Sequence, residues 1–151
     1  MRLIFLLSFL SCVLISFSQI DEHHKNEFGM ANSPVYFLKS KEISYGIHFH
    51  YTRHLNHSKF GIGLAYERIF DKHKHNTFGA VIAYSPLDKL TISASPGFTY
   101  EGLTKEFMPA LHLETTYEFE LGHIHIGPLL EFALDSEDQH ISLGLHLGYG
   151  F

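Results

Sequence analysis

The sequence predicts an all-β protein: an eight-stranded antiparallel up-and-down barrel preceded by a signal peptide. Three observations lead to this prediction. The chain has 151 residues, enough for one domain. Beyond residue 20, short segments alternate large apolar residues with small or polar ones, which is the period of a β-strand, and none has the spacing of a long helix. The links between the segments are short and polar or contain glycine, and consecutive hairpins of this kind favour a meander.

The first 19 residues, MRLIFLLSFLSCVLISFSQ, have the pattern of a secretory signal peptide. A basic residue begins it, an apolar run covers 3–17, and Ser16 and Ser18 supply the small residues of a cleavage site. The apolar run is shorter than a comfortable membrane span, and a retained anchor is the alternative. We therefore expect residues 1–19 to be removed, 20–26 to form a short N-terminal segment, and 27–151 to form the barrel.

The charge balance limits the classes of partner. The chain has 16 acidic and 11 basic residues and a formal net charge of −5. The basic residues do not cluster, which argues against nucleic acid as a partner. The only cysteine, Cys12, lies in the expected signal peptide, so we expect no disulfide and no thiol chemistry in the mature chain. Thirteen histidines are many for this length and need an explanation.

The first four predicted strands range from irregular to strictly alternating. Segment 27–38 is the least regular and contains Pro34. Three regular segments follow: 42–54 (EISYGIHFHYTRH), 59–70 (KFGIGLAYERIF) and 76–85 (NTFGAVIAYS). Each places mainly tyrosine, phenylalanine, isoleucine and leucine on one face, and mainly glycine, alanine, histidine and threonine on the other.

The last four predicted strands continue the pattern. They are 90–100 (LTISASPGFTY), 106–121 (EFMPALHLETTYEFEL), 123–134 (HIHIGPLLEFAL) and 140–151 (HISLGLHLGYGF). The final segment is the most regular, with a large apolar residue at every second position and glycine, serine or histidine between them. The links PLDK, EGLTK, Gly122 and DSEDQ contain the residues that favour turns.

The size difference between the two faces predicts which one points outward. An eight-stranded barrel has a narrow interior, so its small residues belong inside and its large apolar residues outside. An outward apolar face is typical of an outer-membrane barrel, whose interior is polar. The alternative is a soluble lipocalin-like barrel, in which the large face would line the interior and bind a small apolar ligand.

The aromatic residues favour the membrane alternative, because they fall near strand ends, where two interfacial belts are expected. If the N-terminus is periplasmic, one belt contains Tyr51, Tyr84, Tyr117, Phe119, Tyr149 and Phe151, and the other contains Tyr66, Phe70, Phe98, Tyr100 and Phe132. Arg68 is the clear charged residue on the apolar face, and it falls near a strand end, where a charge costs little.

The signal peptide, the eight amphipathic strands and the terminal LHLGYGF resemble the small eight-stranded outer-membrane barrels of Gram-negative bacteria, the OmpA/OmpX-type group. The segments SPGFTYEG and PLLEF, and Gln19 after the expected cleavage site, resemble uncharacterised barrels of Bacteroidetes-type bacteria. The resemblance implies an outer-membrane location, with lipid as the surrounding partner. It also implies that the outer-membrane assembly machinery reads the last strand, which ends in Phe151. We expect a monomer.

The same alternation predicts a polar network inside the barrel. The residues expected to point inward are Arg53, Glu67, Glu114, Glu118, Glu131, His48, His50, His112, His125 and His146. Because unpaired buried charges are costly, we expect histidine–carboxylate and arginine–carboxylate pairs to fill this space. Eight strands leave no open pore, so we predict a structural scaffold without a channel and without a cofactor.

Two chemical alternatives stay open. His48 and His50 share a face, as do His112 and Glu114, and His146 is expected at a similar depth, so these five residues are candidate metal ligands. Ser142, His140 and Glu131 are candidate catalytic residues of a lipid A-modifying enzyme, since a serine nucleophile needs a base and an orienting acid. All three are expected to face the interior, whereas a lipid substrate would arrive from outside.

Overall fold

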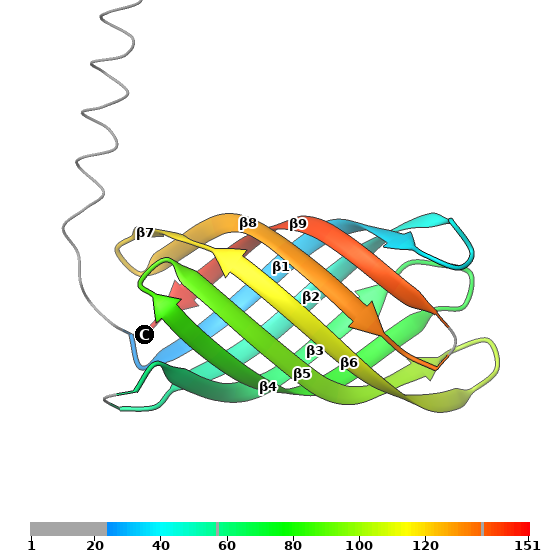
Figure 1. Ribbon diagram of the computed structural model, residues 1–151, viewed down its shortest axis with the longest axis horizontal. Helices are drawn as coiled ribbons and strands as arrows, with labels where there is room; N and C mark the ends of the chain where they lie inside the picture. The colour runs from blue at the N-terminus through cyan, green and yellow to red at the C-terminus, as the bar shows by residue number, and fades with distance from the viewer. Residues whose placement is uncertain (1–23, 57, 137) are drawn as a thin grey trace, which may run out of the picture.

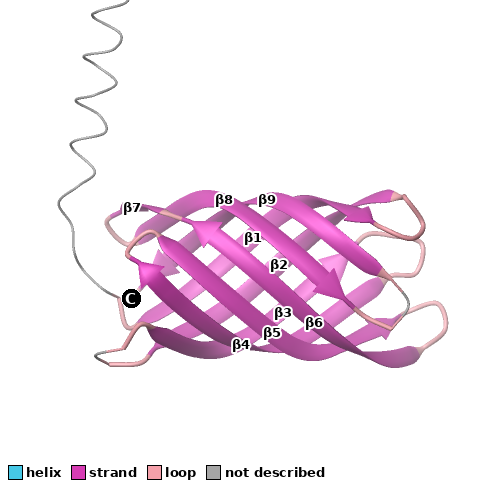
Figure 2. Cartoon of the chain, in the orientation of Figure 1, coloured by secondary structure: helices cyan, strands magenta, loops and turns pink. Residues whose placement is uncertain are grey.

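The computed structural model describes residues 24–151 except residues 57 and 137. The predicted signal peptide, residues 1–19, lies outside the described residues. Figure 2 shows strands joined by loops throughout the described part of the chain. The strands are β1 (Asn26–Phe37), β2 (Ile43–His54), β3 (Phe60–Ile69), β4 (His75–Leu87), β5 (Leu90–Glu101), β6 (Glu106–Tyr117), β7 (Phe119–Leu121), β8 (Ile124–Leu134) and β9 (Gln139–Gly150).

These strands form one closed antiparallel barrel. Each strand from β1 to β5 pairs with the next, β9 pairs with both β1 and β8, and β8 pairs with β6 to close the ring. The short strand β7 continues the line of β6 along β8, because Thr116 opposes Leu129 and Phe119 opposes Ile126 in the same register. Strands β6 and β7 therefore make one wall strand, and the barrel has the eight strands that the sequence predicts.

The strands connect in simple up-and-down order, so successive links alternate between the two ends of the barrel (Figure 1). One end, here called the terminal end, carries the β2–β3, β4–β5 and β7–β8 turns and the junction of the first and last strands. At this junction the amide of Asn26 donates to the Phe151 carbonyl (2.9 Å), and the amide of Phe151 donates to the Asn26 carbonyl (2.8 Å). The opposite end, here called the loop end, carries the other four links.

Burial alternates along the strands, and the alternation places the large apolar residues outside. Side chains such as Leu143, Leu64 and Phe98 are 60–67% exposed at the outer surface. Most of the buried side chains are glutamate, histidine, serine or threonine. Only one apolar cluster, Val35, Phe37 and Ile69, forms among the buried described residues. The interior is polar and the exterior apolar, so the lipocalin-like alternative, which needs an apolar interior, is wrong.

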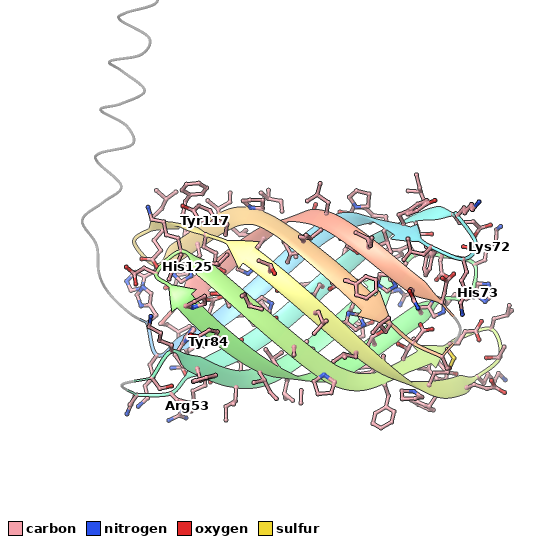
Figure 3. The ribbon with its side chains drawn as sticks, viewed as in Figure 1. Arg53, Lys72, His73, Tyr84, Tyr117 and His125 are labelled. Atoms are coloured by element: carbon pink, nitrogen blue, oxygen red, sulfur yellow. The ribbon has the colours of Figure 1, made fainter. Side chains whose placement is uncertain are left out.

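The outward aromatic rings lie near the two ends of the barrel and pair across neighbouring strands. Near the terminal end the ring centroids of Phe60 and Tyr84 lie 4.9 Å apart; Figure 3 labels Tyr84 and Tyr117 there. Near the loop end the rings of Tyr66 and Phe78 also lie 4.9 Å apart. All eleven aromatic residues of the two predicted belts are exposed or half-buried, and none is buried inside the barrel.

Candidate functional site: the histidine–carboxylate lumen

Among the described residues, the buried carboxylates of the barrel interior form ion pairs only with histidines. Six glutamates are buried: Glu27, Glu67, Glu101, Glu114, Glu118 and Glu131. Every lysine and arginine among the described residues is exposed. Each of the six glutamates lies within ion-pair distance of at least one imidazole. Lysine and arginine are charged at neutral pH. Histidine, by contrast, changes between its neutral and charged forms in this pH range.

The position of the Arg53 side chain differs from the one that the sequence predicts. Arg53 was expected inside the barrel, but its side chain is exposed at the outer surface near the terminal end (Figure 3). The physical reason is the strand period: Thr52 is buried on the inner face, so its neighbour Arg53 must point outward. The predicted arginine–carboxylate pair inside the barrel is therefore wrong.

Glu27, at the start of β1, is the centre of the cluster nearest the terminal end. Its Oε2 atom lies 3.2 Å from His125 Nδ1, and its Oε1 atom lies 3.4 Å from His50 Nε2. His146 Nε2 lies 3.8 Å from the same Oε1 atom. Glu118 completes the cluster, since its Oε1 atom lies 3.2 Å from His146 Nδ1. Two carboxylates thus contact three imidazoles, of which those of His125 and His146 are buried.

Small residues on the inner wall make room for these rings. A Cβ atom added at Gly29 would overlap the imidazoles of His50 and His146, whose centroids lie 5.1 Å apart in a stacked arrangement. Gly29 lies on β1 directly opposite His50 of β2 and Gly148 of β9. The sequence pattern of glycine and histidine on one face therefore reflects packing in a narrow lumen.

Two further groups of residues lie deeper in the barrel. His48 Nδ1 lies 3.0 Å from Glu114 Oε2 and 3.9 Å from Glu131 Oε2. Beyond them, Glu67, His112, Glu131 and His140 meet at one point, with four histidine–glutamate distances between 3.4 and 3.8 Å. We call these last four residues the central quartet.

An apolar layer separates the central quartet from the loop end. The Phe37 ring lies 5.4 Å from the His140 ring on one side and 5.9 Å from the His75 ring on the other, measured between centroids. Val35 and Ile69 pack with Phe37. This layer interrupts the polar interior.

Polar contacts at the loop end order the β3–β4 link. Asp71 accepts hydrogen bonds from the backbone amides of His73 and His75 (both 3.1 Å), and its Oδ2 atom lies 2.9 Å from His75 Nδ1. Burial alone would raise the pKa of Asp71, but these hydrogen bonds hold that pKa at about 2. Nearby, His73 and Thr104 both contact the buried Glu101 carboxylate.

A cavity of about 570 Å³ opens the interior at the terminal end. Its charged and titratable lining consists of both acids and bases: Glu27, Asp88, Glu118 and Glu120, with Lys25, Lys59, His24, His54 and His125. A smaller space of about 30 Å³, reached past Glu27 and Glu118, extends toward Glu114. The interior therefore narrows from the terminal end to dimensions of about one water molecule.

The structure divides the five predicted metal ligands among three groups. His48, His50 and Glu114 have ligand atoms within 4.8 Å of one another, His146 joins Glu27 and His50, and His112 belongs to the central quartet. The predicted depth of His146 is correct in that its ring stacks on that of His50. Sequence reasoning did not place Glu27 or Glu101 inside, because Glu27 begins the irregular first segment and Glu101 follows the predicted end of its strand.

The three candidate catalytic residues do not assemble a triad. His140 Nε2 lies 3.4 Å from Glu131 Oε1, so a base and an acid are adjacent. Ser142 lies opposite Glu131 on the neighbouring strand, but its buried Oγ atom has no hydrogen-bond partner among the described residues. A serine that is not bonded to its base lacks the activation that nucleophilic attack requires.

The barrel can be compared with known proteins at the level of fold. No protein-family model and no curated protein matches the chain. Among solved structures it is similar to a de novo designed transmembrane β-barrel (TM-score 0.57, 11% identity, 85% of this chain and 99% of that one). It is also similar to Neisserial surface protein A (TM-score 0.55, 9% identity, 83% and 96%). A third is Ail, the attachment invasion locus protein of Yersinia pestis (TM-score 0.53, 14% identity, 83% and 96%).

These likenesses confirm the predicted fold class. Among the described residues no helix is long and apolar enough to cross a bilayer. The finer resemblance to Bacteroidetes-type barrels stays a prediction. The chain has the fold of the small eight-stranded outer-membrane β-barrels, and an outer-membrane location is consistent with that fold.

Proposed function

We propose that the protein is an integral outer-membrane scaffold whose lumen is sealed by its own side chains. The observation that carries this proposal is the inverted distribution of residues: an apolar exterior surrounds an interior filled by glutamate–histidine pairs. An apolar exterior suits a wall that faces lipid, and an interior filled by side chains leaves no open pore. The links are short, which favours a structural role over a receptor with large binding loops.

The apolar layer supports a sealed lumen. Phe37, Val35 and Ile69 are at most 5% exposed and lie between the central quartet and the loop end. Hydrated ions crossing the barrel would have to displace both this layer and the buried ion pairs. Breaking a buried pair leaves an uncompensated charge, which costs several kcal/mol, roughly 3–5.

Bilayer recordings test the sealed lumen. Purified protein inserted in a planar bilayer should give no steady conductance. A large general porin in the same membrane is the positive control and should conduct. A matched variant, Phe37→Ala, reduces the apolar layer but leaves the ion pairs in place, and it should also stay closed. Step-like conductance of the unaltered protein would contradict the proposal, and a reduction of that conductance by Phe37→Trp would place the open pathway beside Phe37.

Cell fractionation tests the location separately. The protein should be recovered with outer-membrane lipid and should need detergent for release. Recovery in the aqueous periplasmic fraction without detergent would contradict a membrane location.

A further inference from the structure

We propose that the central quartet, Glu67, His112, Glu131 and His140, is a binding site for one divalent transition-metal ion of the Zn²⁺ type. This site differs from the set that the sequence suggested, since it shares only His112 with it. The proposal is independent of the scaffold role, because a sealed barrel can exist with or without the ion.

The distances within the central quartet match the edges of a small coordination polyhedron. His112 Nδ1 lies 3.7 Å from Glu67 Oε2 and 3.5 Å from Glu131 Oε2. His140 Nε2 lies 3.8 Å from Glu67 Oε2 and 3.4 Å from Glu131 Oε1. With metal–ligand bonds of about 2.0–2.2 Å, neighbouring ligand atoms of a tetrahedral site lie about 3.3–3.6 Å apart. One ligand atom from each of the four residues lies within 4.8 Å of the other three, so shifts of up to about an ångström would bring all four ligands onto one ion.

Several of these atoms have no other partner. Glu67 Oε2, Glu131 Oε1 and His140 Nε2 are fully buried, and none has a hydrogen-bond partner among the described residues. Their separations exceed the length of a charge-assisted hydrogen bond, about 2.7–2.9 Å. Buried polar atoms are normally satisfied, so three unsatisfied atoms that face one point indicate a missing group at that point.

The charge and the donor types indicate which group fits. Two ionised buried carboxylates need two positive charges, and the ion pairs of Glu67 and Glu131 among the described residues are all with histidines. One divalent ion supplies both charges while both imidazoles stay neutral. Two imidazole nitrogens and two carboxylate oxygens suit Zn²⁺, Co²⁺, Ni²⁺ or Cu²⁺, whereas Mg²⁺ and Ca²⁺ prefer oxygen ligands alone.

The strand register holds the ligands rigidly. His112 and His140 lie on either side of Ala133, in one row across β6, β8 and β9. Glu131 lies two residues before Ala133 and therefore points to the same side of the wall. Glu67 comes from β3, outside this three-strand group, so closing the barrel brings the fourth ligand to the other three. Sites on strands hold their geometry better than sites on loops.

The interior also provides a route for the ion from one side only. The cavity at the terminal end is lined by the carboxylates of Glu27, Glu118 and Glu120 as well as by Lys25 and Lys59, and the narrower space leads on to Glu114. The Phe37 layer closes the other side, directly against His140. The ion should therefore load slowly, from the terminal end.

Cobalt binding tests the site, because tetrahedral Co²⁺ absorbs visible light strongly and octahedral Co²⁺ weakly. The folded, detergent-solubilised barrel is stripped with a chelator and titrated with Co²⁺. We expect one equivalent to bind with a tetrahedral spectrum that Zn²⁺ displaces. His112→Gln and His140→Gln should each weaken binding more than about tenfold, as expected for a lost contact at a metal site. His125→Gln, which removes a buried histidine of the Glu27 cluster, is the matched control and should bind like the unaltered protein.

Three results would overturn the proposal: no binding, only an octahedral spectrum, or tight binding lost in His125→Gln but kept in His112→Gln. Circular dichroism shows whether each variant keeps its β-structure. If neither quartet variant folds, X-ray absorption of the unaltered Zn²⁺-loaded barrel decides. Four nitrogen or oxygen ligands including two imidazoles support the proposal, and six oxygen ligands contradict it.

Discussion

At the residue scale, the interior of this barrel relies on histidine where other proteins use lysine or arginine. A buried carboxylate needs a cation or several hydrogen-bond donors, and a narrow lumen has little space for a long side chain. An imidazole is compact and can contact two carboxylates at once, as His125 does with Glu27 and Glu118. This explains most of the thirteen histidines that the sequence left to be explained.

Asp71 provides a pH-dependent prediction at this scale. Its pKa is about 2 in the folded protein and has an ordinary value of 3.8, so its contribution to stability is complete above pH 3.8 and lost as pH falls through about 2. Asp71→Asn should therefore lower the free energy of unfolding near neutral pH, and this difference should vanish below about pH 2. Urea unfolding in lipid vesicles at several pH values measures it. Asp88→Asn, in the turn at the terminal end, is the control; an Asp71→Asn deficit that persists at the lowest pH would contradict the prediction.

Sequence reasoning about single residues succeeded where the strand period was unambiguous. Glu67, His112 and Glu131 lie inside because they share a face with glycine and alanine in regular strands. Arg53 was misplaced although the same period puts it outside, next to the inward Thr52. Glu27 was missed because the segment around it has no clean alternation to count from.

At the element scale, the wall depends on close approach between strand backbones. A Cβ atom added at Gly127 of β8 would overlap the carbonyl oxygen of Tyr117, at the point where β6 ends and β7 begins. The sequence predicted one continuous strand over 106–121, and the break at Glu118 was not visible in its alternation. The distance between neighbouring backbones depends on how the whole barrel closes. The side-chain pattern of a single strand carries no information about that distance.

Gly127→Ala tests this close approach. The added methyl group must push β8 away from the β6–β7 junction, so we expect the free energy of unfolding to fall by about 1–3 kcal/mol. Gly79→Ala is the matched control, since a Cβ atom there would meet Ser95 Cβ at 3.3 Å and needs only a small adjustment. Urea unfolding in vesicles compares the two, and equal losses would show that the β6–β7 junction tolerates a side chain.

At the scale of the whole molecule, the barrel is an inverted globular protein, with its charges inside and its large apolar side chains outside. The alternation of large and small faces was enough to predict this arrangement, because it persists through seven of the eight wall strands. The pairing of individual lumen residues was not predictable in the same way. It depends on strand tilt and register around the closed ring, which bring Glu67 of β3 to His140 of β9.

The central claim is that the apolar exterior faces lipid, and a pair of leucine-to-arginine substitutions tests it most directly. Leu143 near the middle of β9 and Leu103 in the β5–β6 loop are almost equally exposed, at 64% and 65%. In lipid vesicles, Leu143→Arg should lower the free energy of unfolding by about 2–4 kcal/mol, because it places a charge near the bilayer centre. Leu103→Arg should change it by less than about 0.5 kcal/mol. Equal, small effects of both substitutions would contradict a lipid-facing wall.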